Sequence, residues 1–344
     1  MEQHFLIVSF SIQGHINPAL RLRKRLCRTD VTFSTVVDDG LISYIPYSDG
    51  FNRGDYVSRI RDVGWKTLSA IVRSLAERGR PVTCVILSLP WMADIACHYG
   101  IPSVLYWIQP ATIFAIYHHY FHSYGGVIAS RVCDPCFEVA VSGIPPVTIR
   151  ELPSLLTITV PDDPYTSIFE SFQEIFSFLD RQKSGAKPRV LINTFDELEA
   201  DALAVVSEVK LIAVGPVMNG VACSGADLFE PDEKRYMEWL DSRPEGSVVS
   251  LSFGSLALIK KRQMEEILRG LKESGRPYLL AVRKDNRSGA VEELGEENGG
   301  MVVDWCSQVR VRQHPVVGVL RDAQRSGTRR WTAWRAECRS GCTK

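Results

Sequence analysis

Short apolar runs alternate along the chain with longer stretches that have the periodicity of a helix. Continuous apolar runs between turn residues are typical of strands that a parallel sheet buries on both faces. We predict strands in two series, at 5–10, 31–37, 84–89, 103–107 and 190–195, and then at 211–214, 248–253, 278–282 and 301–304. Two such series, interleaved with helices, predict an α/β protein of two doubly wound, Rossmann-like domains.

Two of the helices have clear signals at their ends. Asn17 is a favourable N-cap and Pro18 suits the first helical position, so we predict a helix from Asn17 to Arg28. Another helix is predicted around 264–271, where apolar residues recur at i, i+3, i+4 and i+7 and Gly275 fits the helix end.

The domain boundaries follow from where these patterns stop. The pair Gly215-Pro216 begins a loop without either period, which runs to about Pro231. We therefore predict an N-terminal domain over 1–215, a linker over 216–231, a second domain over 232–318, and a tail over 319–344 with neither a strand nor a helix pattern.

One place does not fit a doubly wound sheet. The predicted strand at 31–37 is followed, after only Asp38-Asp39-Gly40, by another apolar run at 41–46. A parallel crossover needs about a dozen residues. Either the two runs form a hairpin through an Asp-Gly turn, or a piece that carries a helix is missing.

Composition and charge indicate which broad class of protein the chain belongs to. With 344 residues, 45% hydrophobic and 23% charged, the chain suits two globular domains, and a formal net charge of zero gives no general signal for nucleic acid or a membrane surface. The start lacks the basic region of a secretory signal, and no run reaches the ~18 apolar residues of a membrane span. The nine cysteines are scattered along the chain, which is typical of a protein that keeps its thiols reduced. We expect a cytoplasmic protein without a nucleic-acid or membrane partner.

A polar segment with a histidine, SIQGHINP at 11–18, lies between the first strand and the first helix. Open α/β sheets bind ligands at the carboxyl ends of their strands. Gly14 allows a tight turn, so that His15 can point into that crevice, where a neutral imidazole can take a proton from a hydroxyl. The alternative is an ordinary polar loop residue.

Two strand ends in the second half also carry polar groups. The hydroxyl and backbone N–H groups around Ser255 suit a phosphate. Trp305 can stack on a base, and the Gln308 amide can bond to its polar edge. From the residues alone, an ordinary Gly-Ser turn and an interface Trp explain them as well.

Longer motifs are more specific. The chain contains FSIQGHINP, WIQPATIFAIYHHYFHSYG, VLINTFDELE, YMEWLDSRPEGSVVSLSFGSLALIKKRQMEEI and GMVVDWCSQVRVRQHPVVG. Over about 1–318 it resembles the plant family-one UDP-glycosyltransferases, nearest the group of anthocyanin 5-O-glucosyltransferases and of crocetin and indole-acetate glucosyltransferases. The resemblance implies the two-domain GT-B fold, with the acceptor bound by the N-terminal domain and the UDP-sugar by the C-terminal one.

The resemblance also implies an activity. Glucose passes from UDP-glucose, a co-substrate and not a cofactor, to a hydroxyl or carboxyl of a small plant metabolite such as a flavonoid, an anthocyanin, a phenolic or a carboxylic acid. His15 is then the base of a direct displacement that inverts the anomeric carbon. Ser255 contacts the phosphate, Trp305 stacks on uracil, and Cys306 and Gln308 complete the donor contacts. No metal is implied, and we expect a monomer.

The chain departs from the family in three places. The Asp that orients the base has no counterpart at 85–91, so Ser88 is the candidate for that role, although a hydroxyl stabilises an imidazolium less than a carboxylate. Relatives have a longer segment near 37–38, which favours the explanation that a piece carrying a helix is missing there over a hairpin. After Gly318 the family's His-Cys-Gly-Trp-Asn-Ser run, which holds the diphosphate, does not follow. The domain over 232–318 is therefore predicted to be a partial UDP-sugar site.

The tail over 319–344 carries seven basic and two acidic residues. Codons exist for which a one-base shift of 319–325 reads Cys-Phe-Val-Thr-His-Ser, and a two-base shift of 331–342 reads Asp-Gly-Val-Ala-Cys-Gly-Val-Pro-Val-Gly-Val. Both resemble the family, so we interpret the tail as a frameshift of the gene or of its reading, not as a nucleic-acid-binding segment, and expect impaired activity. Two alternatives stay open: a non-catalytic protein that binds only the acceptor, and a pseudogene product that does not fold.

Two further groups of residues have spacings that suggest metal ligands, but neither is complete. His118, His119 and His122 lie on a predicted helix at a spacing that suits a metal, but a third ligand off that face is not evident. Cys133 and Cys136 have CxxC spacing without the second pair that a zinc site needs.

Overall fold

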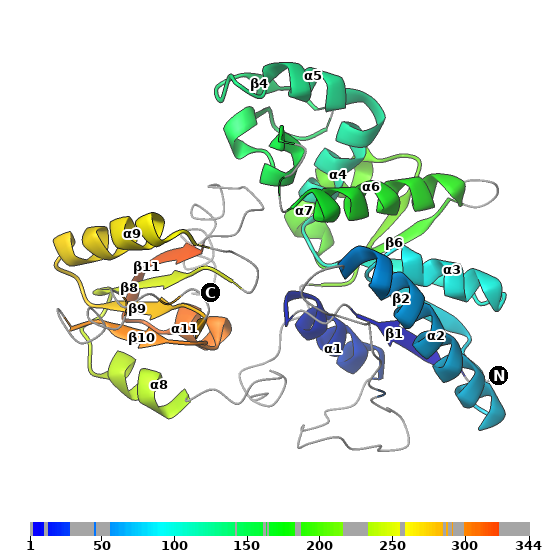
Figure 1. Cartoon of the computed structure of the whole chain (residues 1–344), viewed down its shortest axis with the longest axis horizontal. Helices are drawn as coiled ribbons and strands as arrows, with labels where there is room; N and C mark the ends of the chain where they lie inside the picture. The colour runs from blue at the N-terminus through cyan, green and yellow to red at the C-terminus, as the bar shows by residue number, and fades with distance from the viewer. Residues whose placement is uncertain are drawn as a thin grey trace. The chain divides into compact units, whose positions relative to one another are not determined.

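The structure is a computed structural model that describes residues 3–9, 13–27, 45, 56–141, 143–160, 163, 165–182, 187–215, 233–254, 259–284, 287, 291 and 299–322. These residues fall into two compact units, 3–215 and 233–322, called here unit 1 and unit 2. Each unit is built on its own parallel sheet (Figure 1).

The sheet of unit 1 has the order β1-β2-β3-β6-β7, and every neighbouring pair is parallel. Its strands are β1 (Phe5–Val8), β2 (Cys84–Leu87), β3 (Ser103–Trp107), β6 (Arg189–Ile192) and β7 (Lys210–Ala213). Alternate side chains enter two different apolar clusters, so that Leu87 and Trp107 pack with one set of helices and Ile86 and Tyr106 pack on Leu22. Burial on both faces explains why these strands are continuous apolar runs.

The helices of unit 1 connect these strands. They are α1 (Gln13–Cys27), α2 (Tyr56–Glu77), α3 (Trp91–His98), α4 (Ala111–His119), α5 (Gly125–Arg131), α6 (Thr166–Arg181) and α7 (Asp196–Val205). A π-helix, η1 (Tyr120–Tyr124), joins α4 to α5. The antiparallel pair β4 (Glu138–Val139) and β5 (Val147–Thr148) and the 3₁₀ turns η2 (Ile149–Glu151) and η3 (Ser154–Thr157) fill the stretch before α6.

The sheet of unit 2 has the order β10-β9-β8-β11 and is also parallel. Its strands are β8 (Val248–Ser252), β9 (Tyr278–Ala281), β10 (Met301–Val303) and β11 (Val317–Asp322), and its helices include α8 (Glu233–Asp241), α9 (Lys261–Glu273) and α11 (Gln308–Gln313). Side chains of α8 and α11 pack in one cluster and those of α9 in another. Helices therefore cover both faces of this sheet as well.

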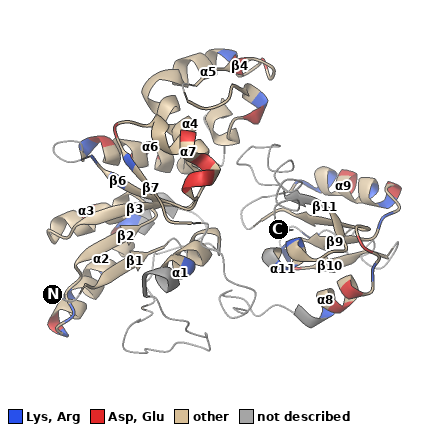
Figure 2. Cartoon of the chain, turned by 180° about the vertical axis from the view of Figure 1, so that it is seen from behind, with Lys and Arg blue, Asp and Glu red and all other residues tan. Residues whose placement is uncertain are grey.

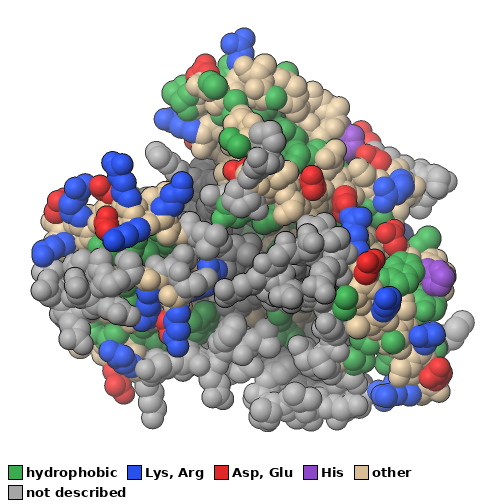
Figure 3. Space-filling view, viewed as in Figure 1, with side chains coloured by type: hydrophobic (Ala, Val, Ile, Leu, Met, Phe, Trp, Pro, Cys, Tyr) green, Lys and Arg blue, Asp and Glu red, His purple; other side chains and the backbone are tan. Residues whose placement is uncertain are grey.

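Helix α9 shows how the sequence pattern becomes packing. Met264, Leu268 and Leu271 are buried, while Lys and Arg side chains of this helix form part of the blue surface in Figure 3. The helix ends at Glu273, and Gly275 follows with φ of +61°, a conformation that glycine adopts without a Cβ penalty. The predicted end at Gly275 is confirmed.

Most predicted strands are confirmed to within two or three residues, but two expectations about local structure were wrong. Helix α1 begins at Gln13, so Asn17 is not its N-cap and Pro18 lies inside it. The tail beyond Gly318 was expected to lack strand structure, yet β11 continues to Asp322, because its backbone pairs in parallel with β8 whatever its side-chain pattern. The predicted runs at 31–37 and 41–46 and the linker over 216–231 lie outside the described residues, apart from Ile45.

Candidate functional site

The carboxyl edge of the sheet in unit 1 carries the predicted base. Strand β1 ends at Val8 and α1 begins at Gln13, so His15 lies in the first turn of the helix that leaves this edge. Gly14 precedes it, and a Cβ at that position would meet no atom within 4 Å. The chain thus brings an imidazole to the edge where ligands of parallel α/β sheets bind.

The environment of His15 fixes its charge. Burial lowers its pKa from 6.5 to about 4, because the protein interior solvates an imidazolium less well than water does. The partial positive charge at the start of a helix acts in the same direction. His15 is therefore neutral at physiological pH, which is the form that can accept a proton.

Ser88, the residue predicted to orient the base, lies at the same edge. In the parallel pair of β1 and β2, Val8 is opposite Leu87, and Ser88 comes directly after that pair. Its side chain is buried. The register thus brings Ser88 and the connection that leads to His15 to neighbouring strand ends.

The predicted donor residues of unit 2 follow the end of β10. Trp305 is partly buried and Gln308 is exposed at the start of α11. Cys306 is buried in the core of unit 2, and this burial raises the pKa of its thiol to about 11. The neutral thiol of Cys306 therefore packs in the core, whereas the side chains of Trp305 and Gln308 are accessible to a ligand.

The remaining donor residue, Ser255, lies outside the described residues. The chain is described up to Gly254, two residues after the end of β8. Because β8 and β10 both flank β9 in a parallel sheet, the segment before Ser255 and the segment from Trp305 leave the same edge of unit 2.

Several known proteins are similar to this chain over most of its length. Phloretin 4'-O-glucosyltransferase of Malus domestica is 38% identical over 372 residues, which cover 92% of this chain and 76% of that protein. Crocetin glucosyltransferase of Gardenia jasminoides is 37% identical, covering 92% and 74%, and mogroside I-E synthase of Siraitia grosvenorii is 37% identical, covering 89% and 71%. The chain belongs to the plant UDP-glycosyltransferases. No protein-family model matches it.

Solved structures show which fold this glycosyltransferase has. Os79 from O. sativa, crystallised in complex with UDP, superposes with a TM-score of 0.71 at 22% identity and covers 93% of this chain and 77% of that one. A glycosyltransferase of Siraitia grosvenorii, also in complex with UDP, superposes with a TM-score of 0.68 at 20% identity. The glycosyltransferase therefore has the predicted GT-B fold of two Rossmann-like units.

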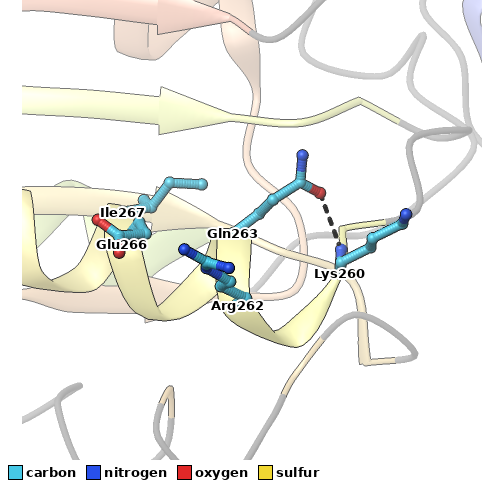
Figure 4. A pocket seen from close by; sticks show the side chains of 5 residues that line it. All are labelled: Lys260, Arg262, Gln263, Glu266 and Ile267. Carbon is cyan, nitrogen blue, oxygen red and sulfur yellow. Dashed lines mark hydrogen bonds between the residues drawn. The ribbon is translucent and has the colours of Figure 1, made fainter.

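A surface hollow of about 480 Å³ lies beside the start of α9 in the glycosyltransferase. Figure 4 shows its lining, which comes from about the first two turns of the helix and the residue before it: Lys260, Arg262, Gln263, Glu266 and Ile267. The dashed contact is a hydrogen bond that the Lys260 N–H donates to Gln263 Oε1, at 3.1 Å, which caps the helix. None of the described donor residues lines this hollow.

The histidines at the α4–η1 junction have a packing explanation. The rings of His118 and His122 stack with centroids 4.2 Å apart, and His122 bonds through Nδ1 to the His118 carbonyl at 2.7 Å. The other ring nitrogen of His122 lies 3.0 Å from the carboxylate of Asp180. Within the described part of the chain, no three His, Cys, Asp or Glu side chains gather as a metal site. Cys133 and Cys136 are free thiols on an exposed turn.

Three contacts around the sites were not predicted. The Tyr236 hydroxyl accepts a hydrogen bond from the Ser307 N–H, Arg287 pairs with Asp304, and Glu199 bonds to the first N–H groups of α4. Each contact joins residues that are not neighbours on one helix or in one turn, so no local sequence pattern predicts it. Of the helices that the structure describes, none has an apolar stretch long enough to cross a bilayer.

Proposed function

We propose that the glycosyltransferase moves glucose from UDP-glucose to an acidic hydroxyl or a carboxyl of a small plant metabolite, with His15 as its base. One observation carries this proposal: an imidazole kept neutral by burial stands at the carboxyl edge of the first sheet. The family relationship and the likeness to UDP-bound structures support the donor class.

The proposed step is a direct displacement. His15 takes the proton of the acceptor hydroxyl while the acceptor oxygen forms a bond to the anomeric carbon from the face opposite the phosphate. The bond between that carbon and the phosphate oxygen breaks, and UDP leaves with the electron pair, so that the configuration of the sugar inverts. Ser88 is proposed to orient the imidazole from the neighbouring strand end.

On the donor side we propose that Trp305 stacks on uracil and that Gln308 bonds to its polar edge. Cys306, buried behind them, acts as packing, and Ser255 contacts a phosphate. The residues after Gly318 do not include the His-Cys-Gly-Trp-Asn-Ser run. Each missing charge-assisted hydrogen bond weakens binding by about 1.5–3 kcal/mol. We therefore propose donor affinity and turnover well below those of relatives that carry the run.

The pKa of His15 favours particular acceptors. A base with a pKa of about 4 removes a proton more readily from a phenol than from an aliphatic alcohol. A carboxylic acid has already lost its proton at neutral pH. Phenols such as phloretin and carboxylates such as crocetin, which the names of two relatives contain, are therefore the first acceptors to test.

The test is UDP release and glucoside formation, measured by mass spectrometry, with UDP-glucose and phloretin or crocetin. We expect slow product with both, and we expect His15→Ala to remove the reaction with phloretin while it slows the reaction with crocetin far less. Equal loss with both acceptors would remove the proton-transfer role of His15. Separate calorimetric titrations with UDP and phloretin test the second candidate: binding of phloretin alone would favour a non-catalytic acceptor-binding protein, and lack of a cooperative melt would favour a chain that does not fold.

A further inference from the structure

Asp304, the residue between β10 and Trp305, is held by two cations. Its Oδ1 lies 2.6 Å from Arg287 Nη2, and its Oδ2 lies 3.8 Å from Lys284 Nζ. The two partners differ in burial: the side chain of Arg287 is 25% exposed and that of Lys284 is 86% exposed. Arg287 is therefore the partner that fixes Asp304, and Lys284 adds little.

Arg287 is itself tied to the sheet. Its Nε donates to the carbonyl of Val282 at 3.4 Å, directly after β9, and the Val282 N–H donates to the carbonyl of Val303 at 2.9 Å, at the end of β10. The guanidinium thus joins the ends of two neighbouring strands through one side chain. The bridge ends on Asp304, the residue directly before Trp305.

The other side of Trp305 is also fixed. The N–H of Ser307 donates to the hydroxyl of Tyr236 at 3.1 Å, and Tyr236 is fully buried. Cys306 lies in the core between them. The backbone of Trp305 is therefore held on both flanks, by an ion pair before it and by a buried hydrogen bond after it.

We infer that Arg287 and Asp304 are positioning residues that set the direction of the Trp305 ring for the base of the donor. This rests on the proposed role of Trp305. Because the carboxylate of Asp304 stays 45% exposed, the ion pair contributes little to folding. A side chain that is ordered before binding does not lose its freedom on binding, so the pair acts on affinity.

The first experiment compares affinity with stability in the full chain. Calorimetric titrations with uridine and with UDP are made for the wild type, Arg287→Ala, Asp304→Ala and the control Lys284→Ala, together with thermal melts. We expect Arg287→Ala and Asp304→Ala to raise both Kd values by the same factor, roughly three- to tenfold, with unchanged melting, and Lys284→Ala to change neither. The charge-swapped double variant R287D/D304R should regain part of the affinity. Equal Kd values for Arg287→Ala and wild type, or a loss that follows melting, would overturn the inference.

A second readout does not depend on the donor. In a chain labelled with 5-fluorotryptophan, the ¹⁹F resonance of Trp305, assigned with Trp305→Phe, should be a single line. It should shift or split in Arg287→Ala and Asp304→Ala, stay in Lys284→Ala, and return in R287D/D304R. If the Trp305 resonance is the same in Arg287→Ala as in the wild type, Arg287 does not position Trp305. A resonance that responds in a chain that binds no uridine leaves the positioning of Trp305 intact and removes the proposed donor function instead.

Discussion

Thr112 donates two hydrogen bonds to the carboxylate of Glu199, one from its backbone N–H at 2.9 Å and one from its hydroxyl at 2.8 Å. The N–H of Ala111 reaches the other carboxylate oxygen at 2.9 Å. These residues open α4, whose first N–H groups have no partner within the helix. A carboxylate from α7, the helix whose ribbon is largely red for Asp and Glu in Figure 2, thus caps α4 and faces the positive end of its dipole.

Removing this carboxylate should destabilise unit 1. We expect Glu199→Ala to lower the free energy of unfolding by about 2–3 kcal/mol, since it leaves three partly buried donors without their acceptor. Glu199→Gln keeps acceptor capacity but not the charge, and should fall in between. Urea unfolding followed by circular dichroism measures the difference. Glu197→Ala, which removes an exposed carboxylate of the same helix, is the control and should stay within about 0.5 kcal/mol; equal losses for both variants would contradict the capping role.

The central strands of both sheets were predictable because their side chains are buried on two faces. A strand such as β3 (Ser103–Trp107) is apolar from Val104 onward, so the run itself marks the element. The start of α1 was not predictable. Asn17 and Pro18 are a strong local signal for a helix start at 17, but α1 packs on the sheet and begins at Gln13 in spite of that signal. Strand β11 was missed for the same reason: its pairing with β8 is a long-range contact.

The candidate site was predictable only in its positions. The structure confirms that Trp305 follows a strand end. His15 was expected in the connection between the first strand and the first helix, but it lies in the first turn of α1, because the helix begins earlier, at Gln13. Their chemical roles came from the resemblance and stay predictions. The residues that hold the segments in place, Tyr236 and Arg287, gave no signal, because a hydroxyl or guanidinium carries no pattern until the fold supplies its partner.

The lowered pKa of His15 makes stability depend on pH. The folded chain binds a proton only near pH 4, whereas the unfolded chain binds it near 6.5. Between these values the unfolded state holds more protons, so stability should fall as the pH is lowered through this window. The full shift corresponds to at most about 3 kcal/mol, an upper limit because the side chain keeps some exposed surface.

The measurement for His15 is a series of urea titrations between neutral pH and about pH 4 for the wild type and His15→Gln. The stability advantage of the wild type should shrink steadily toward the acid end, because the variant has no imidazole to protonate. An advantage that stays constant over the whole window would show that His15 is protonated as readily in the folded chain as in the unfolded one.

The buried thiol of Cys306 should resist alkylation in the native protein. Its pKa is raised to about 11, so the reactive thiolate is scarce near pH 8, and burial blocks the reagent. Cys97, Cys133 and Cys136 are exposed and should react with iodoacetamide first. Peptide mass spectrometry after short labelling times gives the order, and labelling in denaturant is the control in which all should react. Early modification of Cys306 in the native protein would show that the segment after Trp305 opens to solvent.

Gly143 should tolerate no side chain. Its φ of +77° is unfavourable for other residues, and a Cβ there would overlap the Cγ2 methyl of Val205 at the end of α7. Gly79 has nearly the same φ, +74°, but its Cβ would meet no atom within 4 Å. The backbone penalty is therefore shared and the overlap belongs to Gly143 alone. We expect Gly79→Ala to destabilise by about 1 kcal/mol and Gly143→Ala by about 2–4 kcal/mol.

A double variant isolates the overlap. Val205→Ala removes the methyl that the new Cβ would meet, so Gly143→Ala should cost less in the Val205→Ala background than in the wild type. The difference between the two costs, measured by urea unfolding, is the steric part, and what remains should approach the cost of Gly79→Ala. If Gly143→Ala cost the same in both backgrounds, the approach of α7 to this turn would not be the reason for glycine at this position.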